Sequence, residues 1–364
     1  MMTLESKTAT SPDNPYAEEP RAKATRFLQE MKDLTRFHAD RCPAYRRILA
    51  AAYGGRTNFD CLSDFPAMPV RLFKEMDLLS QPSELIVKTL TSSGTSGQRP
   101  SRIFLDKDTA AAQARALVRI VRSFLGVKRL PMMILDHPGV TQDRNTFSAR
   151  GAGILGFSQF GSDQTFALQK DTMLPDWNAI DAFLARYSGE KILLFGFTFI
   201  LWQHLLRAAE DCKRKLDFGD SILIHGGGWK KLEEQKVSNA EFKERLRCTL
   251  GIRSIYNYYG MVEQTGSIFM GCEEGYFHTS DYSEVLVRDP RTLQVQPQGE
   301  PGLIECMSTI PRSYPGHILL TEDLGIVGGT DGCRCGRRGT FFQVLGRLPS
   351  AELRGCSDTH QVPS

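Results

Sequence analysis

Between residues 176 and 260 the chain alternates between short apolar runs and amphipathic segments, and this alternation constrains the fold more than any other feature. Apolar runs at 191–196, 221–225 and 252–256 each lead into glycine, and segments with helical periodicity separate them. Repeated units of strand, glycine turn and helix predict a largely parallel sheet flanked by helices, in an α/β fold. Ligand-binding groups in such a sheet gather at the carboxyl ends of its strands.

Upstream of this region the same patterns predict helices and one further strand. Apolar residues at helical spacing predict a helix over 20–52. Two prolines in segment 65–74 predict extended chain that enters a short helix. We expect Asp108 to cap a helix that runs to Phe124, and a buried strand over 132–135.

The pattern changes after Gly271. Short alternating segments separated by Gly, Pro and Asp (283–287, 302–307 and 317–320) predict a small antiparallel subdomain or barrel. We therefore divide the chain into a disordered N-terminus (1–19), an α/β core (20–270), a small β-rich subdomain (271–347) and a mobile C-terminal tail (348–364).

Bulk properties narrow the class of protein. A net charge of +3 over 364 residues does not favour a nucleic-acid or membrane partner. The start of the chain lacks a secretion signal, so we expect a cytoplasmic protein. The nine cysteines are odd in number and scattered, which indicates reduced thiols rather than a disulfide framework.

Two glycine-rich stretches invite a nucleotide-binding interpretation. Residues 151–156 match G-x-G-x-x-G, but no apolar strand precedes them, so a turn and a tight helix contact are the better interpretation. Residues 91–97, Thr-Ser-Ser-Gly-Thr-Ser-Gly, lie between the apolar runs 85–87 and 103–105. Hydroxyl side chains and free backbone N–H groups of this kind can hold a polyphosphate, although a flexible surface loop has the same composition.

Four short stretches, taken together, carry a resemblance to a known class of enzymes. They are 91–97, the glycines 226–228, the segment 257–263 and the segment 320–325 with 345–347. Their order and strand contexts resemble the adenylate-forming superfamily of acyl- and aryl-CoA ligases and firefly-type luciferases. Further pieces at 66–74, 194–199, 225–230 and 333–339 look like its acyl-protein synthetase (LuxE-type) family.

The resemblance implies ATP and Mg²⁺ as cofactors and assigns a role to each motif. The loop residues Ser92, Ser93, Gly94, Thr95, Ser96 and Gly97 would hold the β- and γ-phosphates. Gly227 and Gly228 would let the backbone approach the adenine, Tyr259 would stack on it, and the adjoining Gly260 would belong to the same cofactor-binding site. Glu263 would bind Mg²⁺, Asp323 the ribose hydroxyls, and Arg347 would form the hinge and contact the ribose.

Structural roles remain open for three of these side chains. Tyr259 could instead be a core tyrosine at a strand end, and Glu263 an acid favoured by a helix N-terminus. Asp323 could be a turn residue before Gly325.

The catalytic groups are less determined. Superfamily ligases carry a C-terminal lid domain with a lysine, and we expect that domain to be absent here because 17 residues follow Arg347 (364 minus 347). Lys230 or Lys231 could supply the missing positive charge, or both could be solvated lysines. By resemblance, Cys356 is the acyl acceptor, for which a thiol on a mobile, glycine-flanked tail is chemically suited, although it could also be a surface cysteine.

Two other groups of residues have alternative interpretations. Cys333 and Cys335, with Cys306 and His317, could bind zinc, but the C-x-C spacing is unusual and free thiols in a glycine-rich hairpin are favoured. Aromatic residues could line an acyl channel with the loop 136–140, or belong to the core; they are Phe195, Phe197, Phe199 and Trp202.

The leading hypothesis is ATP-dependent activation of a carboxylic acid to an acyl-adenylate, followed by acyl transfer to a thiol of the protein itself or of a partner. A carrier protein or reductase is the partner expected. The alternatives are an acyl- or aryl-CoA ligase and a nucleotide-binding subunit without catalysis. The sequence does not distinguish a long fatty acid from a compact aromatic or amino-substituted acid.

Overall fold

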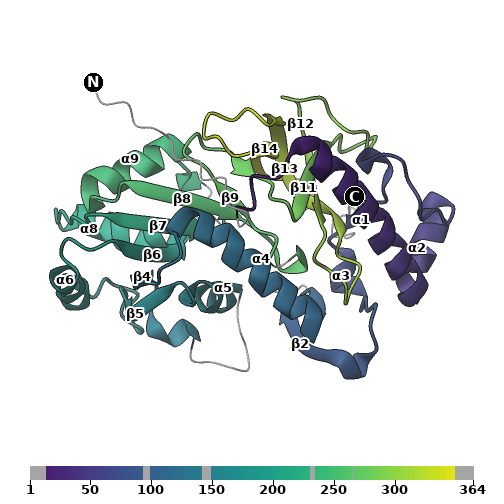
Figure 1. Ribbon diagram of the computed structural model, residues 1–364. Helices are drawn as coiled ribbons and strands as arrows, with labels where there is room; N and C mark the ends of the chain where they lie inside the picture. Colours follow the sequence, from purple (N-terminus) through teal and green to yellow (C-terminus); the bar gives the residue numbers. More distant parts are fainter. Residues whose placement is uncertain (1–13, 93–98, 142–148, 230–233, 265, 349–364) are drawn as a thin grey trace, which may run out of the picture.

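A computed structural model of the chain describes residues 14–92, 99–141, 149–229, 234–264 and 266–348. Its centre is one twelve-stranded sheet with the order β11-β12-β13-β14-β10-β9-β8-β7-β6-β4-β5, and β1 pairs with β13 at the side (Figure 1).

One half of the sheet is parallel, as the α/β alternation predicts. It consists of β5 (Gly161–Phe166), β4 (Leu130–Leu135), β6 (Ile192–Phe197), β7 (Ser221–Gly226) and β8 (Ser254–Tyr259). Successive side chains of these strands enter two different cores. Leu194 and Leu223 face one core, whereas Leu193 and Ile222 face the other. Burial on both faces explains why β4, β6 and β7 are continuous apolar runs rather than alternating ones.

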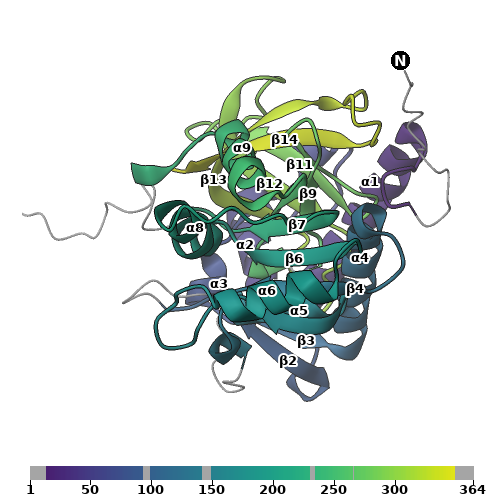
Figure 2. The same ribbon diagram turned by 90° about the vertical axis from the view of Figure 1, so that its left-hand side faces the viewer.

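Helices cover both faces of the parallel half (Figure 2). The core that contains Leu194 is closed by α6 (Trp177–Arg186), the π-helix Leu201–Leu206, α8 (Arg207–Asp211) and α9 (Asn239–Leu250), whereas Ile200 of α7 (Thr198–Ile200) enters the opposite core. The opposite core is closed by α4 (Lys107–Leu125) and α5 (Ala149–Ser158). The glycine pattern 151–156 lies inside α5, and the described residues that come before α5, Pro138–Thr141, form a 3₁₀ helix rather than a strand, so the pattern is not in the strand-to-helix turn that a dinucleotide fingerprint requires.

The other half of the sheet is antiparallel. It consists of β9 (Phe269–Gly271), β10 (Phe277–His278), β11 (Ser283–Arg288), β12 (Pro301–Ser308), β13 (Ile318–Thr330) and β14 (Thr340–Arg347). The change to antiparallel strands after residue 271 is therefore as expected. These strands extend the same sheet through β9 and β8, so the subdomain boundary at 270/271 stays an interpretation.

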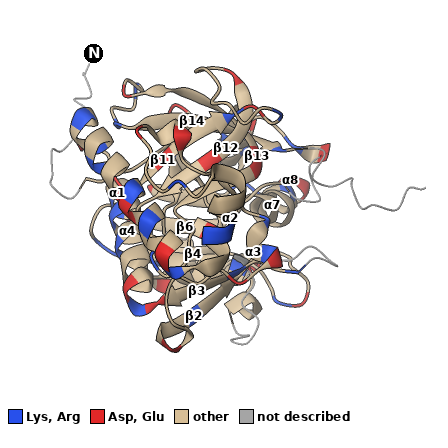
Figure 3. Ribbon diagram, turned by 90° about the vertical axis from the view of Figure 1, so that its right-hand side faces the viewer, with Lys and Arg blue, Asp and Glu red and all other residues tan. Residues whose placement is uncertain are grey.

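The N-terminal segments pack on the antiparallel half and beside it. They are α1 (Pro20–Arg41), α2 (Pro43–Tyr53), the short helices Leu62–Asp64 and Ser83–Leu85, β1 (Met68–Pro69), α3 (Leu72–Glu75), and the separate hairpin of β2 (Ile86–Thr91) and β3 (Arg102–Asp106). Phe27 and Leu34 of α1 pack against Met307 and Ile318 of the sheet. Figure 3 shows acidic and basic residues interspersed along α1 on this side, whereas the charged residues of α2 are both arginines.

Two boundaries differ from the sequence prediction. The expected helix over 20–52 is two helices, because Pro43 restricts Cys42 to an extended conformation (φ −109°, ψ 99°) and removes a backbone donor. The cap of α4 is Asp106 rather than Asp108, since the Asp106 carboxylate accepts the Thr109 N–H at 2.7 Å. In the described part of the chain, no helix is long and apolar enough to cross a membrane.

Candidate functional site

The carboxyl ends of β6, β7 and β8 lie side by side. Phe197 is in register with Gly226, and Gly226 with Tyr258. A side chain at Gly226 would collide with the Tyr258 ring, because an added Cβ would lie 2.2 Å from that ring. Glycine is therefore required at the end of β7 for packing, a role that the sequence pattern did not separate from ligand binding.

The two predicted adenine-facing glycines follow immediately. Gly227 has a φ of 75°, which favours glycine, and Gly228 has no atom within 4 Å of where a Cβ would lie. Both are exposed, and the carbonyl of Gly227 accepts a hydrogen bond from the Thr198 hydroxyl at 2.9 Å. Thr198 thus holds the turn in place, while the two glycines stay exposed to solvent, which suits the approach of a planar ligand. Adenine binding here stays a prediction.

Tyr259 and Asp323 form the clearest pair among the predicted residues. The Tyr259 hydroxyl donates to Asp323 Oδ2 at 2.7 Å, and the Tyr259 ring packs beside Phe269. Burial raises the pKa of Asp323, and the Tyr259 hydrogen bond and the charge of Arg347 act against that rise. Arg347 is opposite Asp323 on β14, with its Nε 3.8 Å from Asp323 Oδ1.

Glu263 lies on a short 3₁₀ helix, Val262–Gln264, after β8. It is 8% exposed, and burial raises the pKa of its carboxyl group while Ser101 and Lys74 act to lower it. The helix is held in place by its backbone, since the Tyr314 hydroxyl donates to the Glu263 carbonyl oxygen at 2.8 Å. Gly260, between β8 and this helix, is exposed, and a Cβ there would lie 3.1 Å from Ile268.

The base of the Ser/Thr/Gly loop reaches this carboxyl group. Ser92 and Ser101 join the two sides of the loop: the Ser101 N–H donates to Ser92 Oγ at 2.9 Å, and the Ser92 N–H to the Ser101 carbonyl at 3.2 Å. Ser101 acts to lower the pKa of Glu263, so this side of the loop base lies near the predicted Mg²⁺ ligand. Other predicted site residues lie outside the described part of the chain; they are Ser93, Gly94, Thr95, Ser96, Gly97, Lys230 and Cys356.

Lys74 is a cation near the site, and its sequence motif alone assigns it no role. The segment 65–74 docks on the site strand β13: β1 pairs in parallel with it, and the Val70 N–H donates to the Leu320 carbonyl at 3.0 Å. Lys74 of α3 is thereby placed where its charge acts on Glu263. The motif at 66–74 contained this residue, but only the pairing with β13 connects it to the site.

A buried ion pair, which the sequence analysis did not predict, lies at the end of β4. Asp136 is fully buried directly after β4, and Arg150 Nε lies 3.1 Å from its Oδ2. Arg150 also contacts His137, with Nη2 3.1 Å from Nε2. Leu135 is in register with Gly196, so this pair lies at the same sheet edge as the strand ends described above.

The predicted aromatic channel is largely core. Phe195 is fully buried and stacks on Phe157 at 4.3 Å, in the core under α4 and α5. Trp202 is 3% exposed and packs with Trp229 on the opposite face of the sheet. Residues on opposite faces cannot line one channel, so the core interpretation holds for Phe195 and Trp202.

Solved structures with this fold include 2-hydroxyisobutyryl-CoA ligase in two states. An open conformation of 2-hydroxyisobutyryl-CoA ligase in complex with 2-HIB-AMP and CoA matches with a TM-score of 0.71 at 18% identity, over 94% of this chain and 80% of that chain. The same ligase in its postadenylation state matches with a TM-score of 0.70 at 17% identity, over 95% of this chain and 72% of that chain. The fold of this chain is thus that of the adenylate-forming ligases.

Sequence comparison specifies the family. The model of the acyl-protein synthetase family, LuxE, matches residues 13–362, and the chain belongs to this family. Two relatives are long-chain-fatty-acid–luciferin-component ligases. The Vibrio harveyi protein is 26% identical over 91% of this chain and 88% of its own length. The Aliivibrio fischeri protein is 26% identical over 80% of this chain and 76% of its own length.

Proposed function

We propose that this protein uses ATP to activate a carboxylic acid and then passes the acyl group to a thiol. Family membership supports this reaction, and one structural observation carries it. Ser101 at the base of the Ser/Thr/Gly loop, the buried Glu263 and Tyr259, which is paired with Asp323, lie near one another at the carboxyl end of β8. The charge of Glu322, adjacent to Asp323, acts to raise the pKa of Glu263, so this part of β13 lies near Glu263.

In the first step a carboxylate oxygen of the substrate forms a bond to the α-phosphorus of ATP. The bond from that phosphorus to the bridging oxygen breaks, and pyrophosphate leaves. The loop Ser92 to Gly97 would hold the β- and γ-phosphates through its N–H and hydroxyl groups. Asp323 would accept hydrogen bonds from the ribose, and Lys74, Lys230 or Lys231 would place positive charge near the phosphates.

The chemistry of Glu263 fits a magnesium ligand. Its carboxylate is a hard oxygen donor whose charged form is disfavoured by burial, and a nearby cation would offset that cost. Bound Mg²⁺ would supply charge neutralisation on the phosphate oxygens.

In the second step a thiolate sulfur attacks the acyl carbonyl carbon and AMP leaves. The acceptor thiol would be Cys356 or the thiol of a partner protein. A CoA thiol is the alternative acceptor, because a CoA ligase has the same fold.

Carboxylate-dependent exchange of labelled pyrophosphate into ATP tests the first step. A panel should contain long-chain fatty acids, short hydroxy acids, and aromatic and amino-substituted acids. We expect exchange with one of these groups and none without acid. Measurable ATP binding with no exchange for any acid would instead identify a nucleotide-binding subunit without catalysis.

The variant Glu263→Gln tests the magnesium ligand. Loss of the carboxylate charge should lower kcat/KM for ATP by about 10²-fold or more, and should raise the Mg²⁺ concentration required. Binding of the carboxylic acid should change little. Unchanged Mg²⁺ and ATP dependence would remove Glu263 from the site.

The variant Cys356→Ser tests the acceptor. Pyrophosphate exchange should persist, because adenylation precedes transfer, but the labelled acyl–protein band seen on gels should disappear. A surviving band would assign the acceptor to another group. Acyl-CoA formation by the wild-type protein, without a protein band, would favour the CoA ligase alternative.

A further inference from the structure

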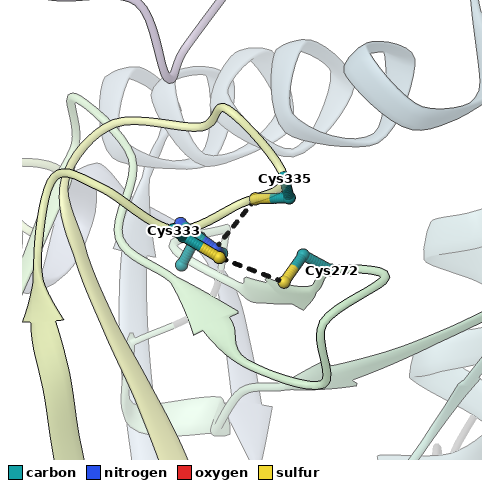
Figure 4. Close-up of side chains that lie close together, drawn as sticks. Cys272, Cys333 and Cys335 are labelled. Atoms are coloured by element: carbon teal, nitrogen blue, oxygen red, sulfur yellow. Dashed lines mark hydrogen bonds between the residues drawn. The ribbon is translucent and has the colours of Figure 1, made fainter. Parts of the chain in front are cut away.

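Three cysteines and one histidine come together in the antiparallel half of the sheet, between the β9–β10 turn and the β13–β14 loop. Cys272 follows β9, His278 ends β10, and Cys333 and Cys335 lie between β13 and β14. Their four potential ligand atoms all lie within 4.8 Å of one another. Figure 4 shows that the three sulfurs point toward a common centre.

The distances are those of a tetrahedral metal site. Zinc binds sulfur at about 2.3 Å and nitrogen at about 2.0 Å. At tetrahedral angles these bond lengths separate two sulfurs by about 3.8 Å, and sulfur from nitrogen by about 3.5 Å. The Cys272 and Cys333 sulfurs are 3.8 Å apart, and Cys335 Sγ is 3.4 Å from His278 Nε2. A disulfide would require sulfurs about 2.05 Å apart, so this geometry is not that of a disulfide.

The surroundings favour a closed site rather than a set of exposed thiols. His278 is fully buried, Cys272 is 2% exposed and Cys333 is 8% exposed. The chain turns tightly at both cysteine segments, with Gly275 N–H donating to the Cys272 carbonyl and Gly336 N–H to the Cys333 carbonyl. Such turns direct sulfurs and backbone N–H groups inward.

From this geometry we propose that Cys272, His278, Cys333 and Cys335 bind one structural Zn²⁺ ion. Three thiolates and an imidazole suit zinc, and four protein ligands leave no position for substrate. Three thiolates with Zn²⁺ carry a net charge of −1. Arg337, which follows the last ligands and pairs with Glu273 at 2.9 Å, supplies a nearby positive charge.

The site would join two parts of the sheet that the chain connects only distantly. It ties the β9–β10 turn to the β13–β14 loop, and β13 and β14 carry Asp323 and Arg347. The zinc would therefore hold the hairpin that presents these two residues, without contacting substrate.

The proposal differs from the grouping that the sequence suggested. His317 instead contacts Thr35, with its Nε2 3.0 Å from the hydroxyl, and stacks near His38. Cys306 is buried on β12, outside the cluster. Cys306 and His317 are therefore matched controls for Cys333 and His278.

Metal analysis by mass spectrometry on protein produced in zinc-containing medium tests the proposal. We expect one zinc per chain in the wild-type protein. Cys333→Ser and His278→Asn should lose most of it, whereas Cys306→Ser and His317→Asn should keep it. Retention in the first pair together with loss in the second would overturn the assignment, as would a wild-type protein without zinc.

A measurement on the wild-type protein covers the case in which ligand variants do not fold. The protein should be prepared with Co²⁺ in place of zinc. Thiolate-to-cobalt charge-transfer bands and strong tetrahedral d–d bands are expected. A weak octahedral spectrum, unchanged by blocking thiols, would overturn the proposal.

Discussion

At the scale of single residues, the site depends on polar groups that the fold has partly dehydrated. Asp323 is held by the Tyr259 hydroxyl, and Glu263 is buried near Lys74. Burial raises the pKa of both carboxyl groups, so neighbouring donors and cations are needed to keep them charged. Removing one such neighbour should change both stability and the pH dependence of activity.

Tyr259→Phe removes the hydrogen bond to Asp323 and leaves the ring. The unfolding free energy should fall by about 1–3 kcal/mol. The pKa of Asp323 should rise, because that hydrogen bond lowers it, so the acid limb of kcat/KM for ATP should move to higher pH. Denaturant titrations and pH–rate profiles measure the two effects.

Tyr258→Phe is the matched control for that variant. Burial alone raises the pKa of Tyr258, whose hydroxyl forms no hydrogen bond within the described ranges. In Tyr258→Phe the acid limb of kcat/KM for ATP should stay at the same pH as in the wild-type protein. Equal shifts in both variants would contradict a specific role for the Tyr259 hydroxyl.

At the scale of elements, the end of β7 combines a packing constraint with an open turn. Gly226 contacts the Tyr258 ring of the neighbouring strand, whereas Gly228, two residues later, is exposed and uncrowded. One glycine is thus needed for the sheet, and the other is available to a ligand.

Gly226→Ala and Gly228→Ala separate these roles. The first should cost about 1–3 kcal/mol of unfolding free energy, because Tyr258 must move. The second should change it by less than about 0.5 kcal/mol but raise KM for ATP, since the backbone is proposed to approach the nucleotide. Urea unfolding and pyrophosphate exchange measure the two; equal loss of stability would contradict the distinction.

At the scale of the whole molecule, buried histidines couple folding to pH. Burial lowers the pKa of His225 to about 3, and the charge of Lys243 acts in the same direction. His38 is likewise lowered to about 3. Because the unfolded chain takes up these protons near pH 6.5 and the folded chain does not, each histidine makes stability fall as pH drops below that value.

His225→Gln should remove one such contribution. Between pH 7.5 and 5.0 the variant should lose about 2 kcal/mol less unfolding free energy than the wild-type protein. The comparison must be made at each pH, because burial raises the pKa of Glu305 to about 7 and gives an opposite trend between about pH 4.5 and 7. Parallel stability profiles in urea would contradict a buried neutral His225.

The polar edge strand β5 was not predicted, but the sequence by itself determined the other four strands of the parallel half, the antiparallel strands after residue 271, and the family. These features follow from local periodicity, glycine placement and motif order, which depend on residues near one another in the chain. The sequence analysis misplaced the cap of α4 and missed the break at Pro43. Caps and helix ends depend on single residues, and the surrounding periodic pattern does not change there.

Tertiary structure alone decided which distant residues meet. Tyr259 and Asp323 are 64 residues apart in the chain, and Cys272 and Cys333 are 61 apart. Arg150 is close to Asp136 in sequence, yet only the shared sheet edge places that pair near the candidate site. Local patterns do not specify strand order or register, and these decide which side chains lie within bonding distance.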